Sequence, residues 1–290
     1  MNVRDIRDMV RLAELGLIAW SVPPRFWRKA AFAICSIGRK RQYAPAYQKI
    51  LERKYTKPEI ADFSTTHRAY LKELRFQILG LNGPWRSWQP DIRLNGAGHL
   101  REALGRGRGA ILWVTATAFS TLISKMAFHY AGYRASMLSR PSHGFSTSSF
   151  GIRFLNPIWT GVEDRFIAER VLIFGEYAAE ALKTVRARLS ENRIVIITVG
   201  AEAHKFTEVP FFDTRLRLPT GPIRLARMTG AAILPVFTIT RDIGKFEVSI
   251  QEPLQPAGAD WDDESIAAAY AKRLEPFVLD HPDQWNGWEL

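Results

Sequence analysis

Cysteine is almost absent from this sequence of 290 residues, which contains one thiol, Cys35. A single cysteine excludes an internal disulfide and fits a reducing, cytoplasmic environment. Cys35 lies among alanine and isoleucine, so we expect a buried structural thiol rather than a reactive one. The sequence also lacks the spaced cysteines and histidines of a zinc site, and it predicts no metal centre.

Long apolar runs are missing as well. No stretch reaches the length of about 18 apolar residues that a membrane-spanning helix needs, so none is expected. The opening residues, Met-Asn-Val-Arg-Asp-Ile-Arg-Asp, do not have the layout of a secretion signal. Internal repeats and low-complexity segments are also absent, and the length predicts one large domain or one domain with an appendage.

Positive charge is in excess, with 40 Lys and Arg against 29 Asp and Glu and a formal net charge of +11. Such a balance concerns partners rather than fold. Anionic lipid headgroups, nucleic acid and an acidic protein such as an acyl carrier protein are the candidates. Because the sequence contains no nucleic-acid-binding signature and no long basic run, we expect no nucleic-acid partner.

Residues 1–60 have the pattern of amphipathic helices. Apolar residues recur at helical spacing before the Pro23-Pro24 break, namely Ile6, Val10, Ala13, Leu17 and Trp20. A second helix is expected from about residue 25, and between residues 1 and 41 nine Lys and Arg accompany three Asp and Glu. Apolar, aromatic helices with basic rims are typical of interfacial membrane helices, so we predict that this segment associates with a membrane. The alternative is a helical hairpin packed on the rest of the chain.

Residues 61–290 are predicted to form an α/β domain. Strands are expected at 92–94, 110–114, 194–197, 232–237 and 246–250, the last alternating like a strand at the edge of a sheet. Helices are expected at 98–104, 119–130, 178–189, 222–228 and 262–279. Strands separated by helices predict a layered α/β sandwich, which we expect to contain a central mixed sheet.

Several short motifs follow one another in a fixed order. The glycine-rich segment 105–109 leads into the strand at 110–114, and 94–100 precedes both. Later motifs are Val209-Pro210-Phe211-Phe212, Thr220-Gly221-Pro222, Leu225-Ala226, Thr229-Gly230-Ala231, Leu234-Pro235-Val236-Phe237 and Pro282-Asp283-Gln284-Trp285. This ordered set, from about residue 70 to 290, resembles the bacterial lipid A biosynthesis (late) acyltransferases, a lysophospholipid acyltransferase-like family.

The resemblance implies a reaction and a location. Such a protein moves an acyl chain from an acyl carrier protein or acyl-CoA thioester to a hydroxyl or amine of a lipid or glycolipid. The thioester is a substrate, and no cofactor is implied. The partners implied are membrane lipid and an acidic acyl carrier protein, with the chain peripheral to the cytoplasmic face of a bacterial inner membrane. The chemistry uses a His as base and an acidic residue five positions later that orients it.

The sequence departs from the family at this His and acid. Aligning residues 109–112 with the family's strand places Ala116 at the histidine and Thr121 at the acid. Neither residue is a general base near neutral pH. None of the six histidines is followed five positions later by Asp or Glu, so the usual pair is absent rather than displaced.

Three alternatives follow from this loss. In the first, His143 in the polar loop 139–146 replaces the base, with Glu163, Asp164 or Glu169 as its partner, and Glu202 is a second candidate acid. In the second, the chain is a catalytically inactive relative that binds lipid or acyl carrier, or acts with a partner subunit that supplies catalysis. In the third, outside the family, it is a basic structural or nucleic-acid-binding protein.

Further residues are predicted to contact substrate. Arg140 belongs to the loop of His143, and Arg153, Arg165 and Arg170 follow that loop. Arginines suit phosphate groups, including that of a pantetheine arm, although surface solubility is the alternative explanation. Gly221 begins a predicted helix, whose N-terminus is suited to an anion.

Overall fold

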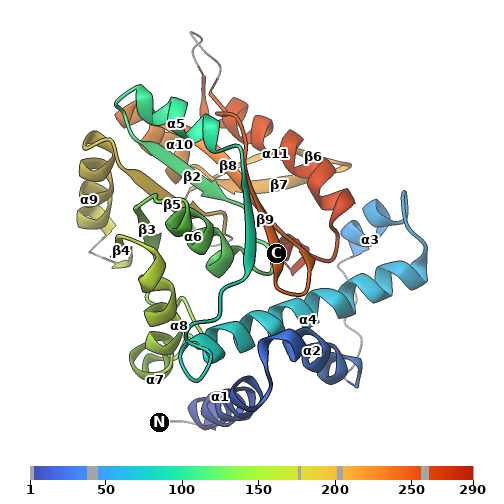
Figure 1. Cartoon of the computed structure of the whole chain (residues 1–290). Coiled ribbons are helices and arrows are strands. Elements are labelled where there is room, and N and C mark those ends of the chain that lie inside the picture. The colour runs from blue at the N-terminus through green and yellow to red at the C-terminus, as the bar shows by residue number, and fades with distance from the viewer. Residues whose placement is uncertain (1–2, 38–44, 176–177, 201–204, 256–260, 290) are drawn as a thin grey trace.

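The computed structural model describes residues 3–37, 45–175, 178–200, 205–255 and 261–289, arranged around a central sheet (Figure 1). The seven strands lie in the order β1-β9-β8-β2-β5-β3-β4. Their bounds are β1 (Asp91–Asn95), β2 (Ala110–Val114), β3 (Ala135–Ser139), β4 (Glu169–Leu172), β5 (Ile194–Thr198), β8 (Ala232–Asp242) and β9 (Lys245–Ile250).

The sheet is mixed, which confirms the predicted layered α/β fold. Strands β2, β3, β4, β5 and β8 are mutually parallel, and β9 runs antiparallel to β8 with β1 parallel to β9. The five parallel strands therefore end at one edge of the sheet, called the carboxyl edge below. Polar residues that follow strands at such an edge are brought close together, and open α/β sheets bind ligands there.

Helices cover both faces of the sheet. One face packs on α4 (Lys57–Leu81), α5 (Ala97–Gly105), α6 (Ser120–Tyr130) and α8 (Asn156–Glu163), and α7 (Ser149–Phe154) lies beside α8. The other face packs on α9 (Ala178–Ser190), α10 (Gly221–Thr229) and α11 (Asp263–Asp280). A two-stranded hairpin, β6 (Phe206–Phe211) and β7 (Thr214–Pro219), packs against α11.

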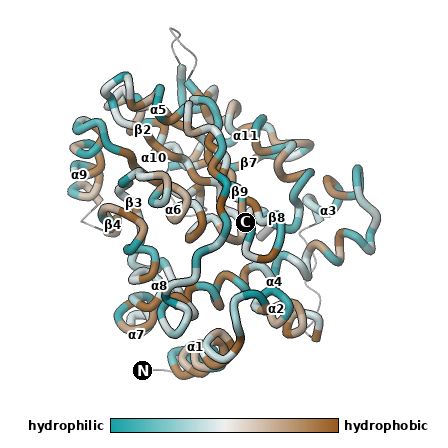
Figure 2. The backbone as a smooth tube through the Cα atoms, in the orientation of Figure 1, coloured by the Kyte–Doolittle hydropathy of each residue, from teal (hydrophilic) through white to brown (hydrophobic). Residues whose placement is uncertain are grey.

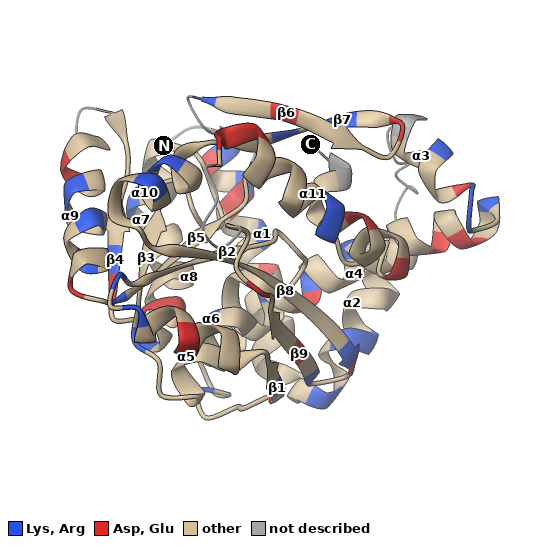
Figure 3. Ribbon diagram, turned by 90° about the horizontal axis from the view of Figure 1, so that it is seen from above, with Lys and Arg blue, Asp and Glu red and all other residues tan. Residues whose placement is uncertain are grey.

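The alternation of a strand divides the core into two layers, as β2 illustrates. Ile111 and Trp113 are buried toward α11, whereas Leu112 and Val114 are buried toward α6. Burying each such side chain contributes roughly 1.5–3 kcal/mol. Figure 2 shows the resulting concentration of apolar residues in the central strands, while Lys, Arg, Asp and Glu lie mainly on the outer elements in Figure 3.

The N-terminal helices pack below the sheet. Helices α1 (Val3–Ser21) and α2 (Trp27–Ser36), joined by a 3₁₀ turn at Pro24–Phe26, lie against α4, and α3 (Pro45–Leu51) lies near the C-terminal residues (Figure 1). Arg28 of α2 donates to Glu73 of α4 at 2.7 Å and to Thr240 of β8 at 2.6 Å. The predicted boundary at residue 60 falls in the first turn of α4, and the division into two parts stays a prediction.

One expectation about the sheet was wrong. Residues 246–250 form part of β9, which lies between β1 and β8 rather than at the edge. Its alternation has another cause: Phe246, Val248 and Ile250 are buried in the core, while Glu247 and Ser249 on the opposite face are only partly covered. The alternation of apolar and polar residues in β9 therefore reflects that one face of the strand is buried and the other is partly covered. It does not indicate that β9 lies at the edge of the sheet.

Candidate functional site

The segment aligned with the family's histidine follows β2 at the carboxyl edge. Ala116 is half-buried two residues after β2, and Thr121 lies in the first turn of α6. The backbone N–H of Asn286 donates to the Ala116 carbonyl at 3.0 Å, and the N–H of Ala118 donates to the Gln284 carbonyl at 2.9 Å. The C-terminal residues are thus attached directly to this segment.

The predicted Pro-Asp-Gln-Trp motif explains how the tail is held there. The side-chain amide of Gln284 accepts from the Thr240 N–H at 2.7 Å and donates to the Thr240 carbonyl at 3.2 Å. Trp285 is buried against Tyr47 and Phe211. These contacts fix the backbone around Ala116 without providing a proton acceptor for catalysis.

Several polar atoms around this segment are buried without a hydrogen-bond partner among the described residues. They are Trp113 Nε1, Thr121 Oγ1, Thr238 Oγ1 and Asn286 Oδ1. Most buried polar groups in folded proteins are hydrogen-bonded, so a group of unpaired ones is unusual. This part of the carboxyl edge therefore retains hydrogen-bonding capacity that the described protein atoms do not use.

His143 lies at the same edge, in the loop after β3. Its Nε2 atom is 2.9 Å from Oε2 and 3.1 Å from Oε1 of Glu163, the last residue of α8. Of the three predicted partners, the structure brings only Glu163 to His143. Asp164 pairs with Arg170, and Glu169 pairs with Ser136 and Arg188.

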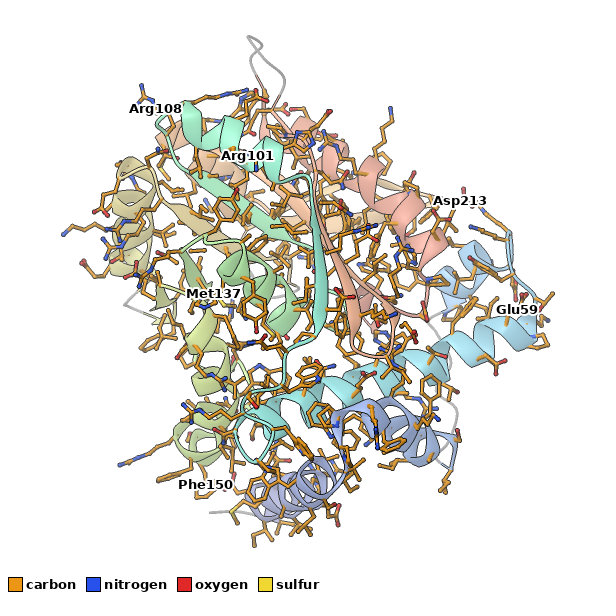
Figure 4. All side chains as sticks on the ribbon, viewed as in Figure 1. Glu59, Arg101, Arg108, Met137, Phe150 and Asp213 are labelled. Atoms are coloured by element: carbon orange, nitrogen blue, oxygen red, sulfur yellow. The ribbon has the colours of Figure 1, made fainter. Side chains whose placement is uncertain are left out.

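Glu163 is the centre of a buried charged cluster, the Glu163 cluster, formed with His143, Lys125 and Arg170. Lys125 Nζ is 2.8 Å from Oε1 and Arg170 Nη2 is 2.8 Å from Oε2. The Glu163 side chain is fully buried and that of Lys125 is 1% exposed. Trp159 donates from Nε1 to Oε1 at 2.9 Å, so both carboxylate oxygens are held. Figure 4 marks the neighbourhood through Met137 of β3, whose sulfur is near the Arg170 guanidinium.

The groups around Glu163 determine its charge state. Burial alone raises the pKa of a carboxyl group, but the charge of Lys125, the hydrogen bond from His143 and the charge of Arg170 outweigh burial and hold the pKa of Glu163 well below its usual range. Glu163 is therefore ionised at neutral pH. Sequence reasoning missed Lys125, although a lysine inside an apolar helix was a signal that a buried partner exists.

Two of the arginines predicted to bind substrate lie near His143. Arg170 is committed to the cluster and also donates to Ser139 at 3.0 Å. Arg140 is exposed at the start of the loop, and its carbonyl accepts from the His143 N–H at 3.1 Å. Their contact with substrate stays a prediction.

The other predicted binding residues are not part of this cluster. Arg165 donates to the carbonyls of Leu81 and Arg86, both at 3.0 Å, and so anchors the end of α4. Arg153 is exposed on α7, and Gly221 begins α10 on the other face of the sheet. Glu202, the second predicted catalytic residue, lies outside the described residues.

A surface pocket lies at the opposite edge of the sheet. It has a volume of about 380 Å³ and is lined by Gly96, His99, Ser249, Gln251, Glu252 and Arg273. These residues follow or adjoin the C-terminal ends of β1 and β9. Because β9 runs antiparallel to β8, and β1 runs parallel to β9, both strands end at the edge of the sheet opposite the carboxyl edge. Arg101 and Arg108, labelled in Figure 4, mark this end of the molecule, whereas Phe150 of α7 marks the end near α1.

Neither a candidate metal site nor a candidate membrane span occurs in the described ranges. No group of three or more His, Cys, Asp or Glu side chains is arranged there to hold a metal ion. None of the helices in the part of the chain that the structure describes is long and apolar enough to cross a membrane.

Comparisons with known proteins show a resemblance to lipid acyltransferases. Residues 163–288 match the model of the bacterial lipid A biosynthesis acyltransferases. Over 226 residues the chain is 27% identical to the phosphatidylinositol mannoside acyltransferases of Mycobacterium tuberculosis strains H37Rv and CDC 1551. That alignment covers 75% of this chain and 65% of each relative, so the chain spans slightly less than two thirds of their length.

A solved structure was also matched, the 1-acyl-sn-glycerophosphate acyltransferase PlsC of Thermotoga maritima. It aligns over 96% of this chain and 98% of its own with 12% identity and a TM-score of 0.38, which is too low to support an inference. The resemblance to this family therefore rests on the sequence match and on the ordered motifs. Over residues 163–288, the chain is similar to the bacterial lipid A biosynthesis acyltransferases.

Proposed function

We propose that the chain transfers a fatty acyl group from an acyl carrier protein or acyl-CoA thioester to a hydroxyl or amine of a lipid or glycolipid at a membrane surface. The match of residues 163–288 to the lipid A biosynthesis acyltransferases supports the reaction class. The structural observation that carries the proposal is the exposed apolar face of α1, which adjoins the loop after β3. Asp8 of α1 accepts from Ser146 at 2.7 Å, and Arg4 donates to Thr147 at 2.6 Å.

The exposed face of α1 has the composition of a membrane-binding surface. Its large exposed apolar residues lie at helical spacing and are Val3, Ile6, Val10, Leu17 and Trp20. The indole of Trp20 also donates to the Leu79 carbonyl of α4 at 2.9 Å, so this residue lies at the border of the exposed face. Leu17 is 70% exposed and Trp20 is 50% exposed. Phe26 of the 3₁₀ turn, Ile34 of α2 and Ile37 just after α2 are also exposed.

Basic side chains accompany this surface. Arg7, Arg11, Arg25 and Lys29 are exposed on the same helices and the turn between them. Each cation near an anionic bilayer contributes on the order of 1 kcal/mol to binding. We propose that residues 1–60 associate with membrane lipid at the cytoplasmic face of a bacterial inner membrane. An acidic acyl carrier protein suits the net charge of +11, and no nucleic-acid partner is proposed.

A second candidate function is favoured by Ala116 and Thr121. A chain without the family's base and acid can bind acyl carrier or lipid, or regulate a partner subunit that supplies catalysis, without turnover. Loss of general-base catalysis alone lowers a rate by about 10²–10⁴-fold. A thioester is already activated, so orientation of the two substrates can still produce measurable transfer.

Turnover separates the two candidates. Labelled acyl carrier protein and acyl-CoA thioesters are incubated with a membrane lipid extract and either the native chain or the double variant Ala116→His, Thr121→Glu. Labelled lipid formed by the native chain supports the acyltransferase. Transfer only by the double variant supports the inactive relative, and absence of both transfer and donor binding contradicts both.

Membrane docking has its own test. We expect Leu17→Asp to weaken binding to vesicles that contain anionic phospholipid at least tenfold, because burying one leucine contributes roughly 1.5–3 kcal/mol. The matched control is Leu182→Asp on α9, which is 38% exposed and remote from α1. Equal binding by the native chain and the Leu17 variant in a flotation assay contradicts the proposed surface.

A further inference from the structure

We propose that His143 is the general base of the transfer reaction and that Glu163 is its positioning residue, in place of the family's missing pair. This inference rests on the proposed acyltransferase function. Ala116 and Thr121 leave the usual positions without a base, whereas His143 and Glu163 form a histidine–carboxylate pair at the same edge of the sheet.

The two nitrogens of the His143 ring have different surroundings. Because Nε2 faces the ionised Glu163, Nε2 carries the ring proton and donates a hydrogen bond to the carboxylate. Among the described residues nothing hydrogen-bonds to Nδ1, and the side chain is 22% exposed. Nδ1 therefore presents an unprotonated lone pair to the outside of the cluster, as a general base requires.

Glu163 is held so that it fixes the orientation of the ring. Lys125 and Trp159 bind Oε1, Arg170 binds Oε2, and the edge of the Trp159 ring system meets the imidazole at a centroid distance of 6.0 Å and an interplanar angle of 78°. A carboxylate with all these contacts cannot rotate without breaking several buried bonds. The same arrangement of an oriented base recurs in catalytic pairs and triads.

The His143–Glu163 pair lies between α6 and the loop that is bonded to α1. Lys125 links Glu163 to α6, where it also donates to the Thr121 carbonyl one turn earlier, so the pair adjoins the helix that carries the family's acid position. On its other side the His143 loop is bonded to α1 through Ser146 and Thr147. A lipid acceptor that reaches the protein along α1 thus meets this loop.

The proposed step is balanced by the two substrates alone. Nδ1 of His143 takes the proton of the acceptor hydroxyl as its oxygen attacks the thioester carbonyl, forming the new carbon–oxygen bond. The tetrahedral intermediate collapses with cleavage of the carbon–sulfur bond. The imidazolium then returns its proton to the leaving thiolate, which gives an ester, a free thiol and the neutral histidine.

A pH profile distinguishes this role from a structural one. In the imidazolium form Nδ1 carries a proton and cannot accept another, so transfer slows as the ring is protonated. The charged groups facing or flanking the ring are Glu163 of α8, Lys125 of α6, Arg170 of β4, Asp164 through Arg170, and Arg140 of the same loop. The two acids and the two buried cations keep their bonds when the ring alone is replaced.

The test uses His143→Gln in the full chain, because the glutamine amide can keep the bond to Glu163 while lacking a basic nitrogen. We expect kcat to fall about 10²–10⁴-fold, the acidic limb of the pH profile to disappear, and donor binding and the circular dichroism spectrum to stay unchanged. His129→Gln at the exposed end of α6 is the control and keeps native turnover.

The outcomes separate this inference from the proposed function. If the native chain transfers acyl groups and His143→Gln has an unchanged kcat or an unchanged acidic limb, the base assignment is overturned. The proposed acyltransferase function is unaffected by that result. No turnover by the native chain with any donor contradicts the proposed function, and the base assignment falls with it. A native-like fold with the large loss of kcat and the lost limb supports both.

Discussion

Replacing Glu163 by Gln tests the electrostatics of the buried cluster. The Lys125 side chain is 1% exposed, and its ammonium lies 2.8 Å from the Glu163 carboxylate. Among the described residues its other hydrogen bond is to the Thr121 carbonyl. Glu163→Gln therefore leaves the buried charge of Lys125 without this counter-ion. Removing one member of a buried pair costs roughly 3–5 kcal/mol. We expect a loss of that size in the free energy of unfolding, measured by urea titration with tryptophan fluorescence.

Two further variants test whether the loss of stability comes from the buried charge of Lys125. Adding Lys125→Met to Glu163→Gln removes the uncompensated charge, so the double variant is expected to recover at least about 1 kcal/mol. Glu180→Gln, which loses an exposed pair with Lys183, is expected to change stability by less than about 0.5 kcal/mol. A Glu163→Gln variant as stable as the native chain, or a double variant no better than the single one, would refute the reasoning.

The lowered pKa of Glu163 predicts that the stability of the fold depends on pH. Because the pKa of Glu163 is lowered in the folded chain from its usual value of 4.5, its ionisation stabilises the fold fully above that pH. This contribution is lost as the pH falls below 4.5 toward the lower, folded-state pKa. The native chain should therefore lose stability in acid more steeply than Glu163→Gln, as measured by urea titration at a series of pH values.

Two predictions concern other parts of the fold. Gly109→Ala should destabilise the chain by at least about 1–2 kcal/mol, because φ is +70° and a Cβ atom would lie 2.7 Å from the Arg193 carbonyl oxygen; Gly105→Ala, where nothing lies within 4 Å, should not. Arg28→Met should cost about 3 kcal/mol in thermal or urea unfolding, since it leaves the buried Glu73 carboxylate without its cation. A native-like midpoint for either destabilising variant would contradict the corresponding packing argument.

The sequence predicted the elements whose burial pattern is strong. Residues 110–114 and 232–237 are continuous apolar runs, and both are central strands of the sheet. Strands β3 and β4 were not predicted, because Ala135–Ser139 contains two serines and Glu169–Leu172 begins with two charged residues. These short strands are specified by pairing, of β3 with β5 and β4 with β3, which no local pattern reveals.

The β6–β7 hairpin was missed for a related reason. Pro210 lies inside β6, and proline within a run normally argues against a strand. The hairpin forms its own two-stranded sheet, so β6 has only one paired edge and can accommodate the missing N–H of proline. Its place in the fold comes from packing on α11, a long-range contact.

The candidate site was predictable in part. The replaced positions Ala116 and Thr121 follow from alignment, and Glu163 was one of three acids considered for His143. Choosing among those acids required the fold, because all three lie 20 to 26 residues from His143 along the chain. Lys125 comes from a helix on the other side of the cluster, and only the tertiary structure places its ammonium against Glu163.

The most direct measurement of the central claim is mass spectrometry of lipids after incubation of the native chain with an isotope-labelled acyl thioester and a bacterial membrane lipid extract. We predict a lipid that is heavier by one labelled acyl group, with one free thiol released for each group transferred. A native chain that binds the thioester and the membrane, yet forms no labelled lipid and releases no thiol with any donor, would contradict it.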